Sequence, residues 1–416
     1  MGALERGARG ARRALIQSVL ASMSDNAPSA ASSGRRRLVV EGWRFVPHSF
    51  AIVAQSHCLS LLSNADIELR FADLPYYDDA WRRTRGIFSA DQEAALAALR
   101  PPERDFRPDA TFTLRPERPD FSAPPAGRRF CFGTAEYRVL KIRNQSGLRS
   151  GAEVPDSVSV IAPSHWPALA YERFGISRDR IHVVPHGIDP AVFRPDPSTR
   201  SATREALGLK DAFIYLSIGA MTWNKGIDVL LAAFARVCEK QRDAVLFLKG
   251  ADAIYDSRDL VRRTLDALPE HTRAAAASRM VYDGGTYAAA RMADLLRAAD
   301  VYVSPYRAEG FNMPVLEAAA CGVPVICTAG GPTDEFTHEP FARRIRSSPR
   351  QIRLAGGDAG DYLEPDVEHL VELMLKAALE RDHAARRSAA GAAHVAEHFT
   401  WDRVTEHLVD LLFGST

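Results

Sequence analysis

Short runs of apolar, mostly β-branched or aromatic residues recur along the chain, and between them lie stretches in which apolar residues return every three or four positions. The first pattern predicts buried strands, and the second predicts helices that pack one face on a sheet. Alternating strands and helices favour parallel sheets, because a parallel connection needs a crossover that is usually a helix. The predicted strands are 37–41, 67–71, 110–114, 130–134, 158–162, 213–218, 245–248, 280–282, 301–304 and 323–328.

The helical stretches carry recognisable start and stop signals. Ser49, Ser164 and Thr400 are predicted N-caps, because a hydroxyl there accepts a hydrogen bond from a first-turn amide. Gly322 is predicted to follow a helix that begins at Pro314, since glycine tolerates the left-handed conformation that ends many helices. Further helices are predicted at 90–99, 227–237 and 289–297, and a polar region after residue 331 is expected to precede two helices, the last at 401–413.

The length of 416 residues leaves room for two domains of ordinary size. We predict an α/β fold of two Rossmann-like, doubly wound parallel-sheet domains, whose ligands would bind at the carboxyl ends of the strands. The predicted N-terminal domain covers 37–195 and the C-terminal domain 205–395, and a last amphipathic helix lies in 396–416.

Residues 1–36 are rich in Ala, Ser, Gly and Arg, and we predict a disordered basic extension there. The first 37 residues hold seven Arg against Glu5 and Asp25, which gives a local charge of +5. A weakly amphipathic helix at 11–23 that touches an anionic membrane is the alternative, less favoured by composition. The segment does not resemble a signal peptide, and Met23 is an alternative start of the chain.

Composition excludes several classes of protein. The net charge is only +1, so no basic field indicates nucleic acid as a partner. The five cysteines are scattered without a CxxC pair, which indicates a reducing, cytoplasmic setting and neither a disulfide framework nor a zinc site. No apolar run approaches the roughly 18 residues that a membrane span requires, so the chain is not expected to cross a bilayer.

The most informative stretch is 299–331, which predicts a strand, a loop, a short helix and a second strand. Glu309 lies on the loop and Glu317 in the first turn of the helix, and Gly310 lets the backbone approach a ligand closely. The amides of 312–315 are unsatisfied helix-start donors, which suit a phosphate group. Carboxylates accept hydrogen bonds from sugar and ribose hydroxyls, so the combination predicts a site for a nucleotide sugar.

The run from Glu309 to Ile326, EGFNMPVLEAAACGVPVI, resembles the signature of the retaining glycosyltransferases of family 4, which have the GT-B fold. The resemblance implies two domains that face a central cleft, a C-terminal helix that crosses back to the N-terminal domain, and a nucleotide sugar bound by the C-terminal domain. It also implies that Glu309 holds donor-sugar hydroxyls and Glu317 the ribose. The amides of Phe311, Asn312 and Met313 would face the diphosphate. Plain packing of the last helix within the C-terminal domain is the alternative.

A second stretch, Gly219 to Gly226, follows the strand at 213–218 and opens a helix. The family commonly has an arginine and a lysine here that hold the diphosphate. Lys225 matches the lysine, but Ala220 stands where the arginine usually is, so phosphate binding is expected to rest on Lys225 and the helix amides. Gly284 and Gly285 match the place where the family's main chain lies against the nucleotide base.

The N-terminal domain is expected to bind the acceptor. Trp43, Arg44 and His48 occupy the loop that usually carries a glycine pair in the family, and they are predicted either to line an acceptor pocket or to be ordinary packing. Arg115 stands near the position of a family histidine that this chain lacks. His186 replaces a usual Asn, and we interpret it as a hydrogen-bonded hinge residue, with a donor ligand as the alternative.

These patterns together predict a retaining glycosyltransferase that moves a sugar from a nucleotide sugar to a glycan or lipid-linked acceptor, with Glu309 and Lys225 as catalytic residues. No Asp-x-Asp follows a strand, so a metal-independent reaction without a cofactor is expected. Bacterial surface polysaccharide synthesis, in the cytoplasm and at most peripherally at the inner face of the membrane, is the expected setting. Two alternatives stay open: a non-catalytic partner subunit with the same fold, which the missing arginine favours, and a phosphorylase or epimerase.

Overall fold

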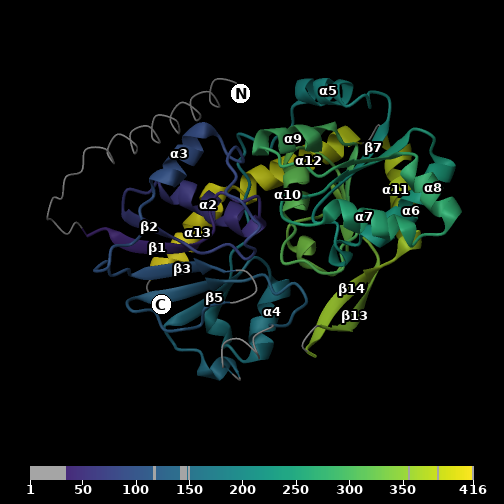
Figure 1. Ribbon diagram of the computed structural model, residues 1–416. Coiled ribbons are helices and arrows are strands. Elements are labelled where there is room, and N and C mark those ends of the chain that lie inside the picture. The colour runs from purple at the N-terminus through teal and green to yellow at the C-terminus, as the bar shows by residue number, and fades with distance from the viewer. Residues whose placement is uncertain are drawn as a thin grey trace.

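The computed structural model describes residues 34–115, 119–140, 148, 150–354, 357–381 and 384–414. These residues form two α/β lobes that lie side by side (Figure 1). Each lobe is built on a six-stranded sheet in which every paired neighbour is parallel. The predicted fold of two parallel-sheet domains is therefore confirmed. The predicted extension lies outside the described residues up to residue 33.

The N-terminal sheet has the strand order β2-β1-β3-β4-β5-β6. Its strands are β1 (Arg36–Gly42), β2 (Ile67–Asp73), β3 (Ala110–Leu114), β4 (Arg128–Phe132), β5 (Val158–Ala162) and β6 (Ile181–Val183). The apolar pattern located five of them to within two residues and missed β6, a three-residue edge strand that is only half-buried and has no apolar run of its own.

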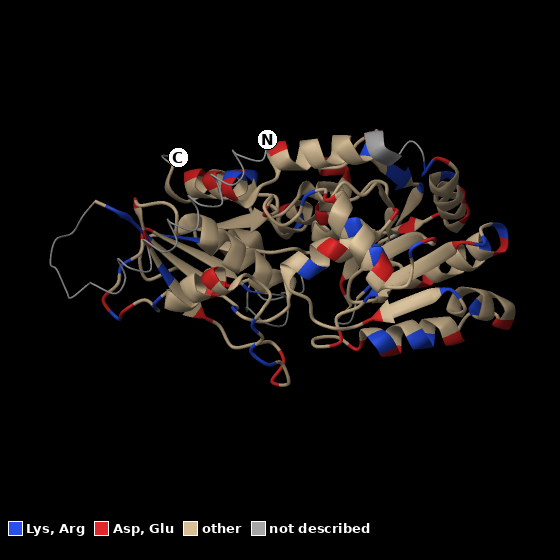
Figure 2. Ribbon diagram, turned by 90° about the horizontal axis from the view of Figure 1, so that it is seen from above, with Lys and Arg blue, Asp and Glu red and all other residues tan. Residues whose placement is uncertain are grey.

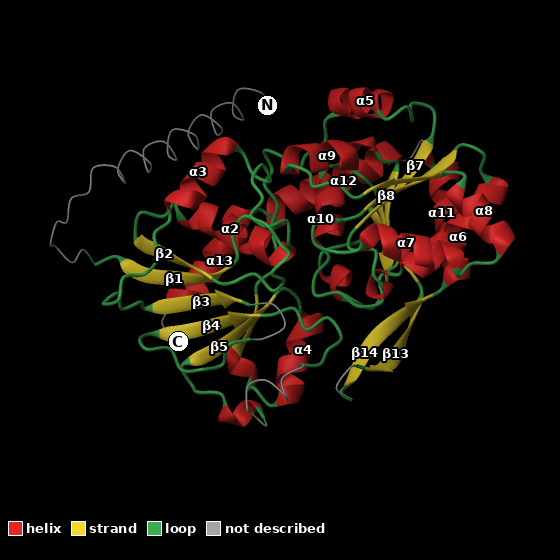
Figure 3. Ribbon diagram, in the orientation of Figure 1, coloured by secondary structure: helices red, strands yellow, loops and turns green. Residues whose placement is uncertain are grey.

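The C-terminal sheet has the order β12-β11-β10-β7-β8-β9. Its strands are β7 (Phe213–Ile218), β8 (Ala244–Lys249), β9 (Met280–Asp283), β10 (Val301–Ser304), β11 (Val325–Thr328) and β12 (Ala342–Ile345). The edge strand β12, sequence ARRI, was not predicted because two arginines occupy its centre. All strands of each six-stranded sheet point the same way, so the loops at their carboxyl ends meet at one edge (Figure 3).

Helices cover both sheets. They are α2 (Ser49–Leu61), α3 (Ala90–Ala98), α4 (His165–Phe174), α5 (Pro197–Ala206), α6 (Ile227–Lys240), α7 (Ser257–Asp266), α8 (Glu270–Ala277), α9 (Ala289–Ala298), α10 (Met313–Ala320), α11 (Val367–Leu379), α12 (Ala384–His398) and α13 (Trp401–Phe413). Three helices, not two, follow the polar region after residue 331. The predicted cap at Ser49 is wrong, because the helix begins at Ser49 and the His48 side chain accepts from the Phe50 amide. Ser164 occupies its predicted N-cap position without making the side-chain cap bond.

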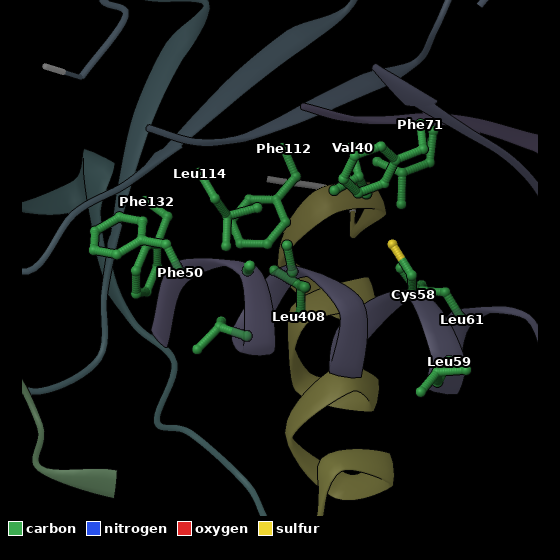
Figure 4. Close-up of a cluster of buried hydrophobic side chains, with 14 of the residues drawn as sticks. Val40, Phe50, Cys58, Leu59, Leu61, Phe71, Phe112, Leu114, Phe132 and Leu408 are labelled. Atoms are coloured by element: carbon green, nitrogen blue, oxygen red, sulfur yellow. The ribbon is translucent and has the colours of Figure 1, made fainter. Parts of the chain in front are cut away.

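The last helix, α13, packs on α2 of the N-terminal lobe, although it follows α12 of the other lobe (Figure 1). Thr400 caps it as predicted, and Thr405 Oγ1 lies 2.9 Å from His57 Nδ1 of α2. Leu408 is fully buried in the N-terminal core, where Figure 4 shows it near Leu114 and Phe112. Apolar burial of this kind contributes about 2 kcal/mol for each leucine-sized side chain, so α13 ties the lobes together.

An antiparallel hairpin of β13 (Ser347–Arg353) and β14 (Ala359–Pro365) occupies part of the polar region after residue 331, where no strand was predicted. It projects from the C-terminal lobe toward α4 of the N-terminal lobe (Figure 3). Asp361 Oδ2 accepts from Arg173 Nη1 at 2.6 Å, and the Asp361 amide donates to Tyr137 O at 2.8 Å. The hairpin is thus a second connection between the lobes.

Positively and negatively charged residues occur in both lobes (Figure 2). The five cysteines are all buried free thiols. Within the described part of the chain, no helix combines the length and the apolar character that crossing a bilayer requires.

Candidate active site

A cleft of about 780 Å³ lies between the lobes, at the carboxyl ends of the strands. Loops that follow β1, β3, β4 and β6 form its N-terminal wall, and loops that follow β7, β8, β9 and β10 form its C-terminal wall. Twelve of the fourteen predicted site residues line it: Trp43, His48 and Arg115 from the N-terminal lobe, and Gly219, Lys225, Gly285, Glu309, Gly310, Phe311, Asn312, Met313 and Glu317 from the C-terminal lobe. Arg44 and Gly284 do not.

Lys225 and Glu309 form an ion pair in this cleft, with 2.6 Å between Lys225 Nζ and Glu309 Oε1. Gly226 has a positive φ of 70°, and a Cβ on it would lie 1.9 Å from Pro305 O, so the chain that carries the lysine passes directly against the β10 loop. Burial disfavours the charged form of Lys225, but the carboxylates of Glu309 and Glu136 outweigh the burial and raise its pKa. Lys225 is therefore a cation at neutral pH.

Arg307, which the sequence did not single out, holds this pair in place. It is 4% exposed, and its guanidinium donates to both oxygens of Asp228 at 2.6 and 2.8 Å. It also donates to both oxygens of Glu364 on β14 at 2.9 and 2.8 Å. Its amide donates to Asn224 O at 2.7 Å, next to Lys225. Arg307 thus fixes the β10 loop, the start of α6 and the hairpin relative to one another.

Glu317 lies in the second turn of α10, because the helix begins at Met313 and not at Pro314. It lines the cleft, and within the described part of the chain its carboxylate has no hydrogen-bond partner. Burial raises its pKa to about 7. Glu317 is therefore not a first-turn residue whose role is to complement the helix dipole. Its carboxylate is free to accept hydrogen bonds from a ligand.

The backbone between Glu309 and α10 turns sharply to face the cleft. Asn312 is left-handed, with φ 79°, and its Nδ2 donates to Ser304 Oγ at 2.9 Å. The amides of Phe311, Asn312 and Met313 donate to no acceptor within the described residues. The Phe311 ring packs on Phe336, with 4.6 Å between ring centroids. The backbone amide of Phe311 is therefore available to a ligand in the cleft, while its side chain is part of the core.

Gly310 is required for a reason other than ligand approach. A Cβ at this position would lie 2.7 Å from Thr134 Cβ in the N-terminal lobe. Its carbonyl accepts from Ser164 Oγ at 2.6 Å, which explains why Ser164 makes no cap bond to its own helix. The glycine thus lets the two lobes meet beside the site.

Lys249, at the end of β8, is a lining residue that sequence reasoning missed. It is 2% exposed, and its Nζ donates to Gly250 O at 2.7 Å and to Gly285 O. Burial lowers the pKa of its ammonium. Gly284 faces away from the cleft, since a Cβ there would lie 1.8 Å from Asp252 Oδ2. A lysine within an otherwise apolar strand was the only available signal for this second cation.

Some of the residues predicted to bind the acceptor line the N-terminal side of the cleft, and others do not. His48 lines the cleft, and Tyr255 OH of the opposite lobe lies 3.1 Å from its Nε2. Burial, followed by the charge of Lys225, lowers the pKa of His48 to about 4, so it is neutral at pH 7. Trp43 lines the cleft but is 3% exposed, with Nε1 bonded to Pro75 O at 2.8 Å. Arg115 also lines the cleft.

Of the two alternatives for Arg44, the acceptor pocket is wrong and ordinary packing is what the structure shows. It is 7% exposed, donates to Asp73 on β2 and to Leu96 O on α3, and lies over the Phe71 ring. The residue therefore stabilises the N-terminal core.

The interpretation of His186 as a hydrogen-bonded hinge is also wrong. It is buried, and its Nδ1 has no partner within the described residues. Its ring packs on Phe311, with 4.8 Å between centroids, and burial lowers its pKa to about 3. The residue lines the cleft as a neutral imidazole.

Comparison with known proteins places this geometry in a family. The model of the family described as Glycosyl transferases group 1 matches residues 212–348, which contain Lys225, Glu309 and Glu317. The C-terminal lobe is a group 1 glycosyltransferase domain. A mannosylfructose-phosphate synthase from Agrobacterium fabrum is 28% identical over 247 residues, which cover 59% of this chain and 50% of that protein. A D-inositol 3-phosphate glycosyltransferase from Xylanimonas cellulosilytica is 31% identical over 248 residues, 58% of this chain and 53% of that protein.

The chain thus spans about half the length of the curated relatives it matches. A solved structure titled as Anabaena Alr3699/HepE in complex with UDP-glucose is similar over 90% of this chain and 99% of that one, with a TM-score of 0.65 and 14% identity. At that identity the likeness concerns the fold alone. It covers both lobes and confirms the GT-B arrangement of the fold.

Proposed function

We propose that this protein is a retaining, metal-independent glycosyltransferase that moves a sugar from a nucleotide-sugar donor to a glycan or lipid-linked acceptor. The observation that carries the proposal is the combination, in one interlobe cleft, of the Lys225–Glu309 pair with Glu317 and three backbone amides that have no hydrogen-bond partner among the described residues. Each suits a different part of such a donor. The matched group 1 domain contains all of them.

The charge that develops on the leaving diphosphate is the part of the reaction that a protein can stabilise most. The Lys225 ammonium and the amides of Phe311, Asn312 and Met313 would face that charge from fixed positions. A preorganised donor of this kind contributes about 3 kcal/mol to the transition state. In this proposal these groups replace both a divalent ion and the arginine whose usual place is taken by Ala220.

The two carboxylates would bind the sugar parts of the donor. Glu309 is 5% exposed and already accepts one hydrogen bond from Lys225, so its second oxygen remains for a donor-sugar hydroxyl. Glu317, in the second turn of α10, would accept hydrogen bonds from the ribose hydroxyls. Its pKa of about 7 predicts tighter donor binding above that pH, because only the ionised carboxylate accepts two such bonds.

The N-terminal wall, with His48, Trp43 and Arg115, would receive the acceptor. The curated relatives include an enzyme named for inositol phosphate and a mannosyltransferase named for phosphatidylinositol mannoside, so sugar-alcohol and lipid-linked acceptors both occur among them. We propose an acceptor of this kind and a role in surface polysaccharide or glycolipid synthesis. We further propose that the protein is located in the cytoplasm and contacts the membrane peripherally.

The test is a screen of UDP-, GDP- and ADP-sugars for a rise in melting temperature, followed by assays of donor hydrolysis and of transfer to sugar-alcohol and glycolipid acceptors. Glu317→Ala should abolish transfer without unfolding the protein, while Glu406→Gln, an exposed carboxylate on α13, should leave it unchanged. The anomeric proton of the product, followed by NMR, reports retention, and activity in EDTA reports metal independence. Inversion, loss of activity in EDTA or full activity of Glu317→Ala would each contradict the proposal.

A further inference from the structure

A second cavity, of about 450 Å³, lies in the C-terminal lobe at the amino ends of its strands, opposite to the cleft. Its walls include Phe213 at the start of β7, Val301 at the start of β10 and Val325 at the start of β11. The first residues of α5 and the turn after α10 complete it. None of its lining residues lines the interlobe cleft, so the two sites are separate.

Arginine dominates the charge of this cavity. Among the residues that the structure describes, five guanidinium groups line it against three carboxylates. The guanidiniums belong to Arg200, Arg297, Arg343, Arg381 and Arg387, and the carboxylates to Asp196, Asp300 and Glu380. Asp243 pairs with Arg381, Asp294 with Arg297 and Asp300 with Arg200, which leaves Arg343 and Arg387 to share the carboxylate of Glu380.

The Glu380 carboxylate lies close to three cationic side chains. Its Oε2 accepts from Arg343 Nη2 and, at 3.0 Å, from Arg387 Nη2, and its Oε1 lies 3.7 Å from Lys376 Nζ. The other carboxylate near Arg343 is that of Glu339, which is exposed to solvent. Within the described residues, three cations thus face two carboxylates, one of which is screened by water.

Arg343 has an unsatisfied donor in this setting. Its side chain is 11% exposed, and its Nη1 is buried with no hydrogen-bond partner within the described residues. Burial and the neighbouring Arg387 lower the pKa of Arg343. An unpaired buried donor on a charged group is costly and uncommon in folded proteins, so it indicates a missing acceptor.

We propose that this cavity binds the phosphate group of a small phosphorylated molecule, held by Arg343 and Arg387. The planar guanidinium matches phosphate oxygens with paired hydrogen bonds. The volume lies in the range of about 300 to 1,000 Å³ that is typical of small-ligand sites. Phe341 and Val323 line the cavity and would pack on the remainder of the molecule. The site is additional to the donor cleft and does not depend on the reaction proposed there.

The α10 helix links the two sites. Met313 and Glu317 near its start line the cleft, while Cys321 and Gly322 after its end line the arginine cavity. A ligand in the cavity therefore contacts the turn that ends the donor-binding helix.

The test is calorimetric titration of the full chain with inorganic phosphate and, separately, with glucose 6-phosphate, at an ionic strength held constant with NaCl. Arg343→Met and Arg387→Met should each weaken binding by about tenfold or more. Arg236→Met, which removes an exposed guanidinium paired with Glu368, should leave it unchanged. Lys225→Met should also retain binding, which separates this site from the cleft.

Arg343→Met should melt at the temperature of the wild type or above it, because it removes an unpaired donor. If that variant does not fold, the binding of Arg387→Met, which changes a half-buried residue, tests the proposal. Binding of both ligands means that the phosphate group alone suffices, and binding of glucose 6-phosphate alone means that the attached molecule is also recognised. No binding to the wild type, unchanged binding in both arginine variants, or loss of binding in Lys225→Met overturns the proposal.

Discussion

Lys225 Nζ and Glu309 Oε1 lie 2.6 Å apart, although 84 residues separate them in the chain. Glu309 is buried and Lys225 is half-buried, so each neutralises the other in a setting from which water is largely excluded. The pair keeps a cation at the mouth of the β7 loop before any ligand arrives. It also means that either residue, changed alone, leaves an uncompensated charge.

Lys225→Met is expected to lower the transfer rate by about 10²-fold or more, because the cation facing the diphosphate is lost. It should also lower the free energy of unfolding by about 3 kcal/mol, since Glu309 remains buried and unpaired. The double variant Lys225→Met, Glu309→Gln should recover most of the stability and none of the activity. Urea unfolding and transfer assays of the three proteins measure both effects, and recovery of activity in the double variant would exclude Lys225 from the reaction.

Glu317→Gln tests the raised pKa of that carboxyl. Burial favours the protonated form in the folded protein, so between its ordinary value of 4.5 and about 7 the folded state binds more protons than the unfolded state. This group therefore lowers the free energy of unfolding as the pH rises through that window, and its effect is constant above it. The stability of the variant relative to the wild type should increase from pH 4.5 to 7.5 in urea unfolding. Glu406→Gln, an exposed control on α13, should show no such trend.

Periodicity located most strands because buried parallel strands are continuous apolar runs, and both sheets follow from it. The features that it missed owe their place to distant partners. β12 carries Arg343 and Arg344 at its centre, and β13, the first strand of the hairpin, is largely exposed. A local apolar pattern cannot identify either of them.

The site residues that belong to a local sequence motif were predicted correctly. The predictions failed for residues whose role depends on contacts with distant parts of the chain. Glu309, Glu317 and Lys225 line one cleft, as the motif spacing predicts. Arg307 was missed because its partners Asp228 and Glu364 lie 79 and 57 residues away. Arg44 was wrongly assigned to the cleft because a sequence does not show on which side of a loop a side chain falls.

Arg307→Lys tests the network that supports the β10 loop. A lysine ammonium cannot form paired bonds with both Asp228 and Glu364, so two half-buried carboxylates lose partners. The variant should lower the free energy of unfolding by about 2 kcal/mol and reduce the transfer rate, because the segment that carries Lys225 is less firmly held.

Arg236→Lys is the matched control. Arg236 also bonds both oxygens of one carboxylate, that of Glu368, but this pair is exposed. Exposed pairs contribute about 0 to 1 kcal/mol, so this variant should be close to the wild type in stability and rate. Equal effects of the two substitutions would mean that burial of the Arg307 network is unimportant.

Asp361→Asn tests the hairpin as a connection between lobes. Its carboxylate accepts from Arg173 at 2.6 Å and lies 3.9 Å from Arg138, both in the N-terminal lobe. These pairs are partly exposed, so their loss should change the free energy of unfolding by only about 0 to 1 kcal/mol. It should instead favour open arrangements of the lobes, which raises the KM for the donor and the radius of gyration in X-ray scattering. Arg350→Gln, on the exposed part of the same hairpin, should change neither quantity. An unchanged radius and KM in Asp361→Asn would show that α13 alone sets the lobe arrangement.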